Sequence, residues 1–271
     1  EGFLVRGDLR EYMGERDGAL ADFGRALEIN PGFAEVRYNR GLTLFRLKRS
    51  AEAAEDFRAA LRLRPGFTDA RSSLAAALAQ AGDAAGALRE YNDLIAEGGE
   101  TARIFVDRAT VRARQGDHAG AIRDCDEAIR VEPRYGRAWS VRGHSRDQRG
   151  DDRGALEDFD RAVELDPGDA DSAINRGGLR GQFRDWRGAL EDAERAIALD
   201  PRRPEAFHNR AVARDAGGDL AGALEDCERA VALGPELAAV WVTRAAMRAK
   251  QGDLAGARAD YDEGVKRNPG L

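Results

Sequence analysis

Apolar residues recur along the whole chain at the spacing of amphipathic helices. In residues 154–165, for example, Ala155, Phe159 and Ala162 fall on one helix face, and most of the residues between them are charged. Stretches of this kind follow one another in pairs, with short polar segments between them. The pattern predicts an all-α chain built from short helices.

Glycine, aspartate and proline mark the ends of the predicted helices. A Gly-Asp pair separates the two stretches of several units, at Gly116-Asp117, Gly150-Asp151, Gly218-Asp219 and Gly252-Asp253. Glycine can end a helix in the left-handed conformation, and aspartate can cap the start of the next helix. A proline after the second stretch disfavours helix at the residue before it. Each unit is therefore predicted to be a helix hairpin.

The prolines also reveal an internal repeat of 34 residues. They are Pro31, Pro65, Pro133, Pro167, Pro201, Pro235 and Pro269, spaced by 34 or once by 68, and Gly99 stands in the gap. Counting each proline as position 32 divides the chain into eight repeats, 1–33, 34–67, 68–101, 102–135, 136–169, 170–203, 204–237 and 238–271. A period of this length indicates a solenoid, which grows by stacking repeats on their neighbours.

Small residues occupy fixed columns of the repeat. Position 20 is always alanine, at Ala19, Ala53, Ala87, Ala121, Ala155, Ala189, Ala223 and Ala257. Position 8 is always Gly or Ala, and position 4 is often aromatic. These columns resemble the tetratricopeptide repeat family, over the whole chain and in register. The resemblance implies an all-α, right-handed superhelical solenoid of about sixteen antiparallel paired helices, residues 1–271, with a concave groove.

Two charged columns depart from the commonest form of that family. Position 7 is arginine and position 23 is acidic in seven repeats, which pairs Arg6 with Asp22, Arg40 with Asp56, Arg108 with Asp124, Arg142 with Asp158, Arg176 with Asp192, Arg210 with Asp226 and Arg244 with Asp260. Position 11 adds a second arginine in six repeats, whereas the third repeat carries Leu74 and Leu78. We expect a ladder of buried ion pairs in which position 7 of the next repeat also approaches position 23. The alternative is a stripe of arginines that binds anions.

By the resemblance, first-helix positions 2, 5, 6, 9, 12 and 13 line the groove. The candidate groove residues are Tyr38, Asn39, Arg46, Arg103, Asp107, Arg114, Arg137, His144, Gln148, Asn175, Gln182, His208, Asn209 and Asp215. The asparagines share position 6, where an amide can both donate to and accept from a peptide backbone. The alternative is ordinary groove polarity. The Lys and Asn pattern that clamps a C-terminal carboxylate in other members of the family is absent.

The junction after the third repeat differs from the others. Residues 97–100 read Glu-Gly-Gly-Glu and lack the proline. Two glycines increase backbone freedom, so we expect a break near 98–100 that divides the solenoid into sub-blocks. The alternative is a tolerated loop variation.

Composition excludes several classes of function. The net charge is −6, whereas nucleic-acid binders usually carry a basic face. No apolar run is long enough to cross a bilayer, so membrane insertion is not expected. Cys125 and Cys227 match buried core positions, and no Cys/His cluster has metal-site spacing. No nucleophile–base arrangement or phosphate loop is present, so we expect no enzyme activity and no cofactor.

These observations favour a scaffold that binds a protein or peptide along its groove. Two alternatives remain, a regulatory or docking arm of a larger multidomain enzyme and an Arg-lined module for small anions. The chain begins at Glu1 without Met and inside a repeat, which suggests that the native N-terminus is missing. Leu271 is position 34 and no polar capping helix follows, so we expect either a piece of a longer protein or self-association through uncapped terminal repeats. A cytoplasmic location is expected, and the Arg-, Ala- and Gly-rich, Lys-poor composition indicates a bacterial source of high G+C content.

Overall fold

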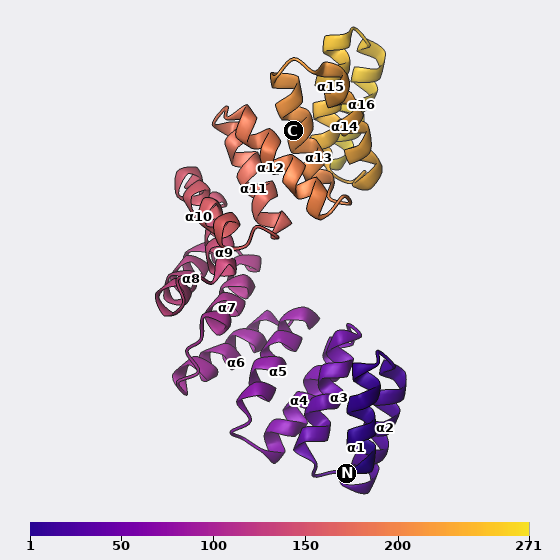
Figure 1. Cartoon of the computed structure of the whole chain (residues 1–271), viewed down its shortest axis with the longest axis vertical. Coiled ribbons are helices and arrows are strands. Elements are labelled where there is room, and N and C mark those ends of the chain that lie inside the picture. The colour runs from indigo at the N-terminus through magenta and orange to yellow at the C-terminus, as the bar shows by residue number, and fades with distance from the viewer. Residues whose placement is uncertain (271) are drawn as a thin grey trace. The chain divides into compact units, whose positions relative to one another are not determined.

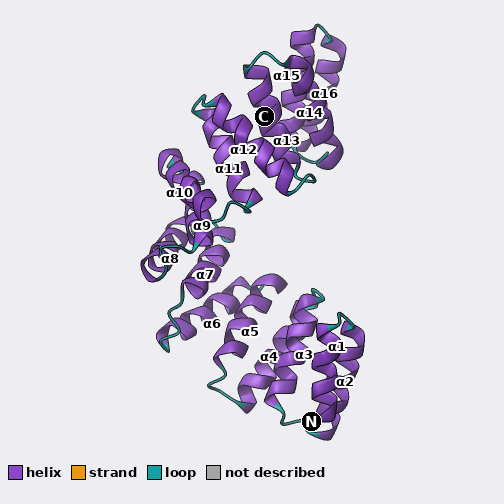
Figure 2. Cartoon of the chain, viewed as in Figure 1, coloured by secondary structure: helices purple, strands orange, loops and turns teal. Residues whose placement is uncertain are grey.

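The computed structural model describes residues 1–270, and this part of the chain contains sixteen α-helices and no strand (Figure 1, Figure 2). The first four repeats hold α1 (Gly2–Tyr12), α2 (Arg16–Ile29), α3 (Ala34–Arg46), α4 (Ser50–Leu63), α5 (Thr68–Ala81), α6 (Ala84–Ala96), α7 (Ala102–Arg114) and α8 (His118–Val131). The last four hold α9 (Gly136–Asp147), α10 (Asp152–Leu165), α11 (Ala170–Gln182), α12 (Trp186–Leu199), α13 (Pro204–Ala216), α14 (Leu220–Leu233), α15 (Ala238–Gln251) and α16 (Leu254–Arg267). The predicted all-α repeat of helix pairs is confirmed.

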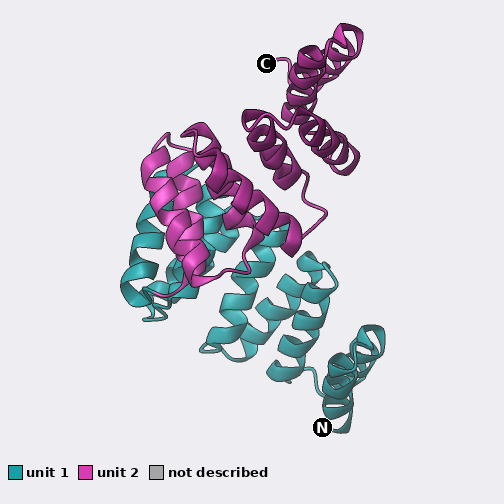
Figure 3. Cartoon of the chain, turned by 45° about the horizontal axis from the view of Figure 1, so that its top comes forward, with its two compact units in different colours: residues 1–133 teal, residues 134–271 magenta. Residues whose placement is uncertain are grey.

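The chain divides into two compact units, residues 1–133 and 134–271 (Figure 3). Unit 1 contains α1 to α8 and unit 2 contains α9 to α16, so each unit holds four helix pairs. At the glycine-rich junction inside unit 1, Gly98 has a φ of +85°, and the Gly99 N–H donates to the Leu94 carbonyl over 2.8 Å. The break expected near 98–100 stays a prediction.

The turn inside each hairpin requires a left-handed residue at position 15. Six repeats supply glycine there, namely Gly14, Gly82, Gly116, Gly150, Gly218 and Gly252, with φ between +78° and +92°. The other two repeats adopt the same region at Lys48 and Arg184, each with φ +63°. The turn therefore keeps a positive φ at position 15 even with lysine or arginine, whose side chains disfavour that conformation.

The aspartate after that turn caps the second helix and constrains a further position. In the fourth repeat, Asp117 accepts from the Gly120 N–H over 2.8 Å. A Cβ on Gly120 would lie 2.0 Å from an Asp117 oxygen, so a side chain there would force the capping carboxylate to shift. Six repeats combine Asp at position 16 with Gly at position 19. The second repeat has neither and instead forms an Arg49–Glu52 ion pair at these positions.

The core of each hairpin forms where the two helices approach most closely. The position 20 alanines are all buried, with exposures from 0% to 9%. Glycine at position 8 makes room for a ring at position 24, because a Cβ on Gly7 would lie only 2.6 Å from Phe23. Cys125 and Cys227 occupy position 24 in two repeats and are fully buried, and burial raises the pKa of Cys227 to about 12. Both cysteines therefore occupy core positions.

Candidate functional site

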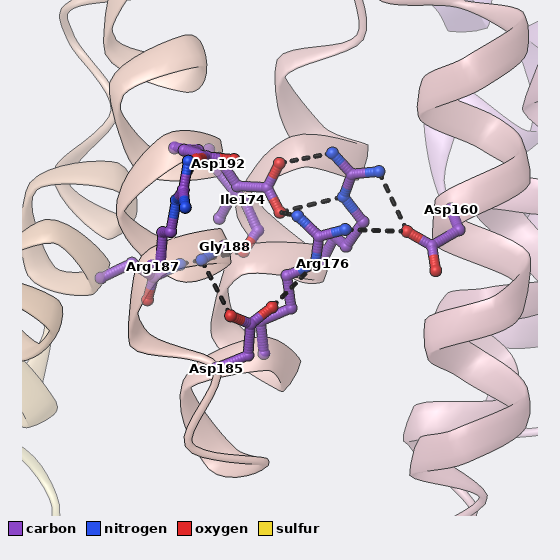
Figure 4. A network of polar contacts seen from close by, with 10 residues as sticks. Asp160, Ile174, Arg176, Asp185, Arg187, Gly188 and Asp192 are labelled. Atoms are coloured by element: carbon purple, nitrogen blue, oxygen red, sulfur yellow. Dashed lines mark hydrogen bonds and ion pairs between the residues drawn. The ribbon is translucent and has the colours of Figure 1, made fainter.

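The acidic residue at position 23 is held by two arginines of its own repeat. In the sixth repeat, Asp192 accepts from Arg176 Nε and Nη2 over 2.9 and 2.5 Å (Figure 4). It also accepts from Arg180 Nη1 over 3.0 Å. Asp192 is only 2% exposed, so these hydrogen bonds compensate for the loss of water around its carboxylate. We call this three-residue arrangement the Arg clamp.

The Arg clamp recurs in both units. Position 7 donates to position 23 over 2.5–3.0 Å in seven repeats, from Arg6, Arg40, Arg108, Arg142, Arg176, Arg210 and Arg244. Position 11 joins at 2.7–3.0 Å in six repeats, from Arg10, Arg112, Arg146, Arg180, Arg214 and Arg248. The acids Asp22, Asp56, Asp124, Asp158, Asp192, Asp226 and Asp260 are 1–3% exposed. Arginines that fill these two columns are thus engaged by carboxylates of the fold.

Where the arginines of these two columns are seen to reach the preceding repeat, they contact its position 25 and not its position 23. Arg176 and Arg180 donate to Asp160 of the preceding repeat over 3.0 and 3.1 Å (Figure 4). Arg108 makes the corresponding contact with Asn92 over 2.7 Å. Ion pairs therefore link the fifth and sixth repeats, and a hydrogen bond links the third and fourth, through a column other than the one expected from the sequence.

Aromatic rings cover several of these arginines. The position 7 guanidinium lies 4.7–5.9 Å from the ring centroid at position 4 in five repeats, over Phe3, Phe105, Trp139, Phe207 and Trp241. Such stacking adds cation–π attraction to the carboxylate contact. The third repeat lacks the clamp, and burial raises the pKa of Glu90, its position 23 acid. Because Leu74 and Leu78 replace the two arginines of that repeat, no Arg clamp stabilises the negative charge of the Glu90 carboxylate.

Many candidate groove residues contact neighbouring repeats. Asn39 donates to Asp8 over 2.8 Å, Arg46 to Glu11 over 2.7 Å, and Asn209 to the Ile174 carbonyl over 2.9 Å. Asp215 pairs with Lys250 at 2.5 Å, and Arg103 lies 3.7 Å from Asp107. Tyr38 packs against Phe57 and Phe67. Asn175 is half-buried, and the exposed members of the set are Arg46, Arg103, Arg114, Arg137, His144, Gln148 and Gln182.

One cavity in unit 2 brings three of the candidates together. It has a volume of about 370 Å³ and lies among α11, α12 and α13, where Gln182, His208 and Asn209 contribute its polar groups. Its apolar lining includes Trp186 and Val212. We call this space the groove cavity. Ligand pockets commonly combine apolar walls with a few polar groups in this way.

Glycines on α11 create the groove cavity. Gly177, Gly178 and Gly181 all line it, although glycine is unfavourable within a helix by about 1 kcal/mol relative to alanine. A Cβ on Gly178 would lie 3.7 Å from Asn209, and one on Gly181 would lie 3.8 Å from Trp186. Both are ordinary contacts, so packing does not require glycine at these two positions. The segment Gly-Gly-Leu-Arg-Gly at 177–181 was the available sequence signal, and sequence reasoning missed it together with Trp186.

His208 predicts a pH dependence for unit 2. Burial lowers the pKa of this imidazole, whose Nε2 lies 2.9 Å from Thr243 Oγ1. Below about pH 6.5 the unfolded chain binds a proton that the folded chain binds less readily, so stability should fall as the pH decreases through that range. We expect His208→Gln to reduce this loss, measured by urea unfolding at several pH values. An unchanged slope of stability against pH would contradict the assignment.

Two further classes of site are absent from the part of the chain that the structure describes. Among residues 1–270, no group of three or more His, Cys, Asp or Glu side chains is placed to hold a metal ion. None of the sixteen helices in that range combines the length and the apolar character needed to cross a membrane. The notable features of the structure are thus the Arg clamps and the cavities between helices.

Solved structures with similar folds come from several proteins. A tetratricopeptide repeat protein from Parabacteroides merdae matches with a TM-score of 0.64 and 19% identity, over 87% of this chain and 93% of that one. MamA from Desulfovibrio magneticus matches with a TM-score of 0.53 and 21% identity, over 62% and 95%. YrrB, described as a TPR protein with an unusual peptide-binding site, matches with a TM-score of 0.55 and 18% identity, over 66% and 93%. At these identities the likeness concerns the fold.

The family comparison covers most of the chain. The tetratricopeptide repeat profile matches residues 4–66, 49–102, 106–170 and 175–238. No curated protein matches the chain. The family matches agree with the 34-residue period and with the helix pairs described above. The chain therefore belongs to the tetratricopeptide repeat family.

Proposed function

We propose that this chain is a non-catalytic scaffold that binds an extended protein or peptide segment. The groove cavity carries the proposal, because it joins an apolar space of about 370 Å³ to polar groups on first-helix positions. Trp186 and Val212 would contact an apolar side chain of the bound segment. Gln182 and the side-chain oxygen of Asn209 can hydrogen-bond to its backbone. The peptide-binding site described for the structural neighbour YrrB supports the same class of function.

The space left by the glycines on α11 indicates which kind of ligand side chain would fit. Alanine or leucine at Gly178 and Gly181 would fill part of the groove cavity. No neighbouring residue fills the space that these side chains would take, because a Cβ at either position has no contact shorter than 3.7 Å. An aromatic or large aliphatic side chain of the partner would bury its surface against Trp186 without displacing the helices. Burial of such a side chain supplies about 1.5–3 kcal/mol. The adjacent amides would then fix the direction of the peptide.

Filling the groove cavity tests this proposal. Peptides selected by phage display against the wild-type chain should bind Gly178→Leu at least about tenfold more weakly, since a tenfold loss corresponds to about 1.4 kcal/mol. Leucine at Ala198, which is exposed on the second helix of the same repeat and does not line the groove cavity, should leave binding unchanged. Affinities are measured by calorimetry, and circular dichroism checks the helix content. Equal affinity of wild type and Gly178→Leu would overturn the proposal.

A further inference from the structure

The second repeat modifies its Arg clamp at two positions. Position 4 is Arg37 where five repeats have an aromatic ring, and position 11 is Leu44 where six repeats have arginine. Asp56 accepts from Arg40 over 2.6 and 2.7 Å, whereas Arg37 Nη1 reaches it only at 3.4 Å. Arg37 at position 4 thus takes the role that the position 11 arginine has in six other repeats, as the second partner of the position 23 acid. The space next to Leu44 is left without the longer side chain that the other repeats place there.

A cavity of about 660 Å³ occupies this region, among α2, α3 and α4. Leu20, Leu44 and Ala59 contribute apolar surface, and Arg37 and the exposed Arg62 also line it. We call it the repeat-two cavity. It lies in unit 1 and shares no lining residue with the groove cavity. It is therefore a separate candidate for ligand binding.

The acids that line the repeat-two cavity are already paired. Asp56 is held by Arg40, Glu52 accepts from Arg49 over 2.6 and 2.7 Å, and Glu55 accepts from Arg58 over 2.7 Å. These contacts account for the three acidic side chains that line the cavity. The positive charges of Arg37 and Arg62 are then the ones available to attract a further anion.

Arg37 also carries a buried donor that lacks an acceptor. Its Nε–H is shielded from solvent and finds no hydrogen-bond partner among residues 1–270. An unsatisfied buried donor is costly, and the cost is larger for a charged group. Arg37 lines the cavity, so a small rotation of its side chain would bring this donor to an anion seated there, which would supply the missing acceptor. The guanidinium plane can present two parallel N–H groups to a carboxylate or a phosphate.

We propose that the repeat-two cavity binds a small organic anion through its carboxylate or phosphate group. Arg37 donates to the anionic group, Arg62 adds positive charge, and Leu20 and Leu44 contact the organic part. This ligand binds independently of the peptide proposed for unit 2. The six repeats that retain arginine at position 11 cannot form the same site, because there that arginine is directed to the position 23 acid.

Nuclear magnetic resonance of the arginine side chains tests the site directly. The full chain is titrated with inorganic phosphate in one arm and with propionate in the other, while the Nε–H resonance of Arg37 is followed. We expect a saturable shift of that resonance with at least one probe, and the more effective arm identifies the anionic group. The absence of a saturable shift with both probes would overturn the proposal.

Three variants separate the site from general charge effects. Arg37→Met should weaken binding at least about tenfold, measured by calorimetry, because it removes the donor and keeps the aliphatic length. Leu44→Arg restores the residue found in six other repeats, should fill the cavity and abolish binding, and is expected to remain folded. Arg123→Met removes an exposed charge elsewhere in unit 1 and should leave binding unchanged. Undiminished binding to Leu44→Arg, or an equal loss in Arg123→Met, would contradict the assignment.

Discussion

Replacing Asp192 with alanine is expected to lower the free energy of unfolding by about 3 kcal/mol, the lower end of the range for breaking a buried ion pair. The substitution removes the acceptor of three hydrogen bonds from Arg176 and Arg180. These side chains are 13% and 22% exposed, so water can solvate their charges only in part once the carboxylate is gone. The loss is measured by urea unfolding of the full chain at neutral pH.

Asp160 provides a matched control for this experiment. It contacts the same two arginines at 3.0 and 3.1 Å, but its side chain is 51% exposed. Exposed ion pairs contribute about 0–1 kcal/mol, so Asp160→Ala should have a small effect. Similar losses for the two variants would show that burial of the acid does not determine the strength of the Arg clamp.

Replacing Gly41 with leucine is expected to destabilise the chain by about 3 kcal/mol, at the upper end of the cost of overpacking a core. A Cβ at this position would lie 2.7 Å from a ring carbon of Phe57, which is fully buried. The two helices of the second hairpin would have to separate to admit the side chain. The effect is measured as a change in the urea midpoint and in the melting temperature.

Gly24 offers the corresponding control on the neighbouring helix. A Cβ at Gly24 meets no other atom within 4 Å, so leucine can be accommodated there. Glycine within a helix is less favourable than a good helix former such as leucine by about 1 kcal/mol of helix propensity. Gly24→Leu should therefore stabilise the chain slightly. Opposite signs for the two substitutions are expected. A stabilising effect at Gly41 would mean that the hairpin core has more room than the structure shows.

The repeat made the local elements predictable from sequence. The 34-residue spacing placed every hairpin, and the Gly-Asp pairs located the turns at which the structure has positive φ at position 15. Columns of Arg and acid were also recognisable, because seven repeats keep both. The glycine at position 19 was overlooked, yet it follows from the cap: Asp117 and Gly120 show that the carboxylate occupies the place of a Cβ.

The candidate site was less predictable, because long side chains can reach several partners. From spacing alone, position 7 could contact position 23 of its own repeat and also position 23 of the preceding repeat. The structure directs Arg176 to Asp192 within its repeat and to Asp160 across the boundary. Asn39 and Asn209, predicted to face a ligand, donate to Asp8 and Ile174 of the adjacent repeat. The distance between stacked first helices decides these contacts, and it is not encoded in one repeat.

The sequence by itself determined the period, the helix pairs, the turns and the family, because these depend on interactions among residues close along the chain or repeated in every unit. The tertiary structure alone decided which carboxylate each arginine contacts and where space is left between helices. The groove cavity requires Gly178 on α11, Trp186 on α12 and Val212 on α13 to meet, and the repeat-two cavity requires three helices in the same way. A cavity depends on the summed volumes of side chains from several helices, so it appears only when those helices are packed together.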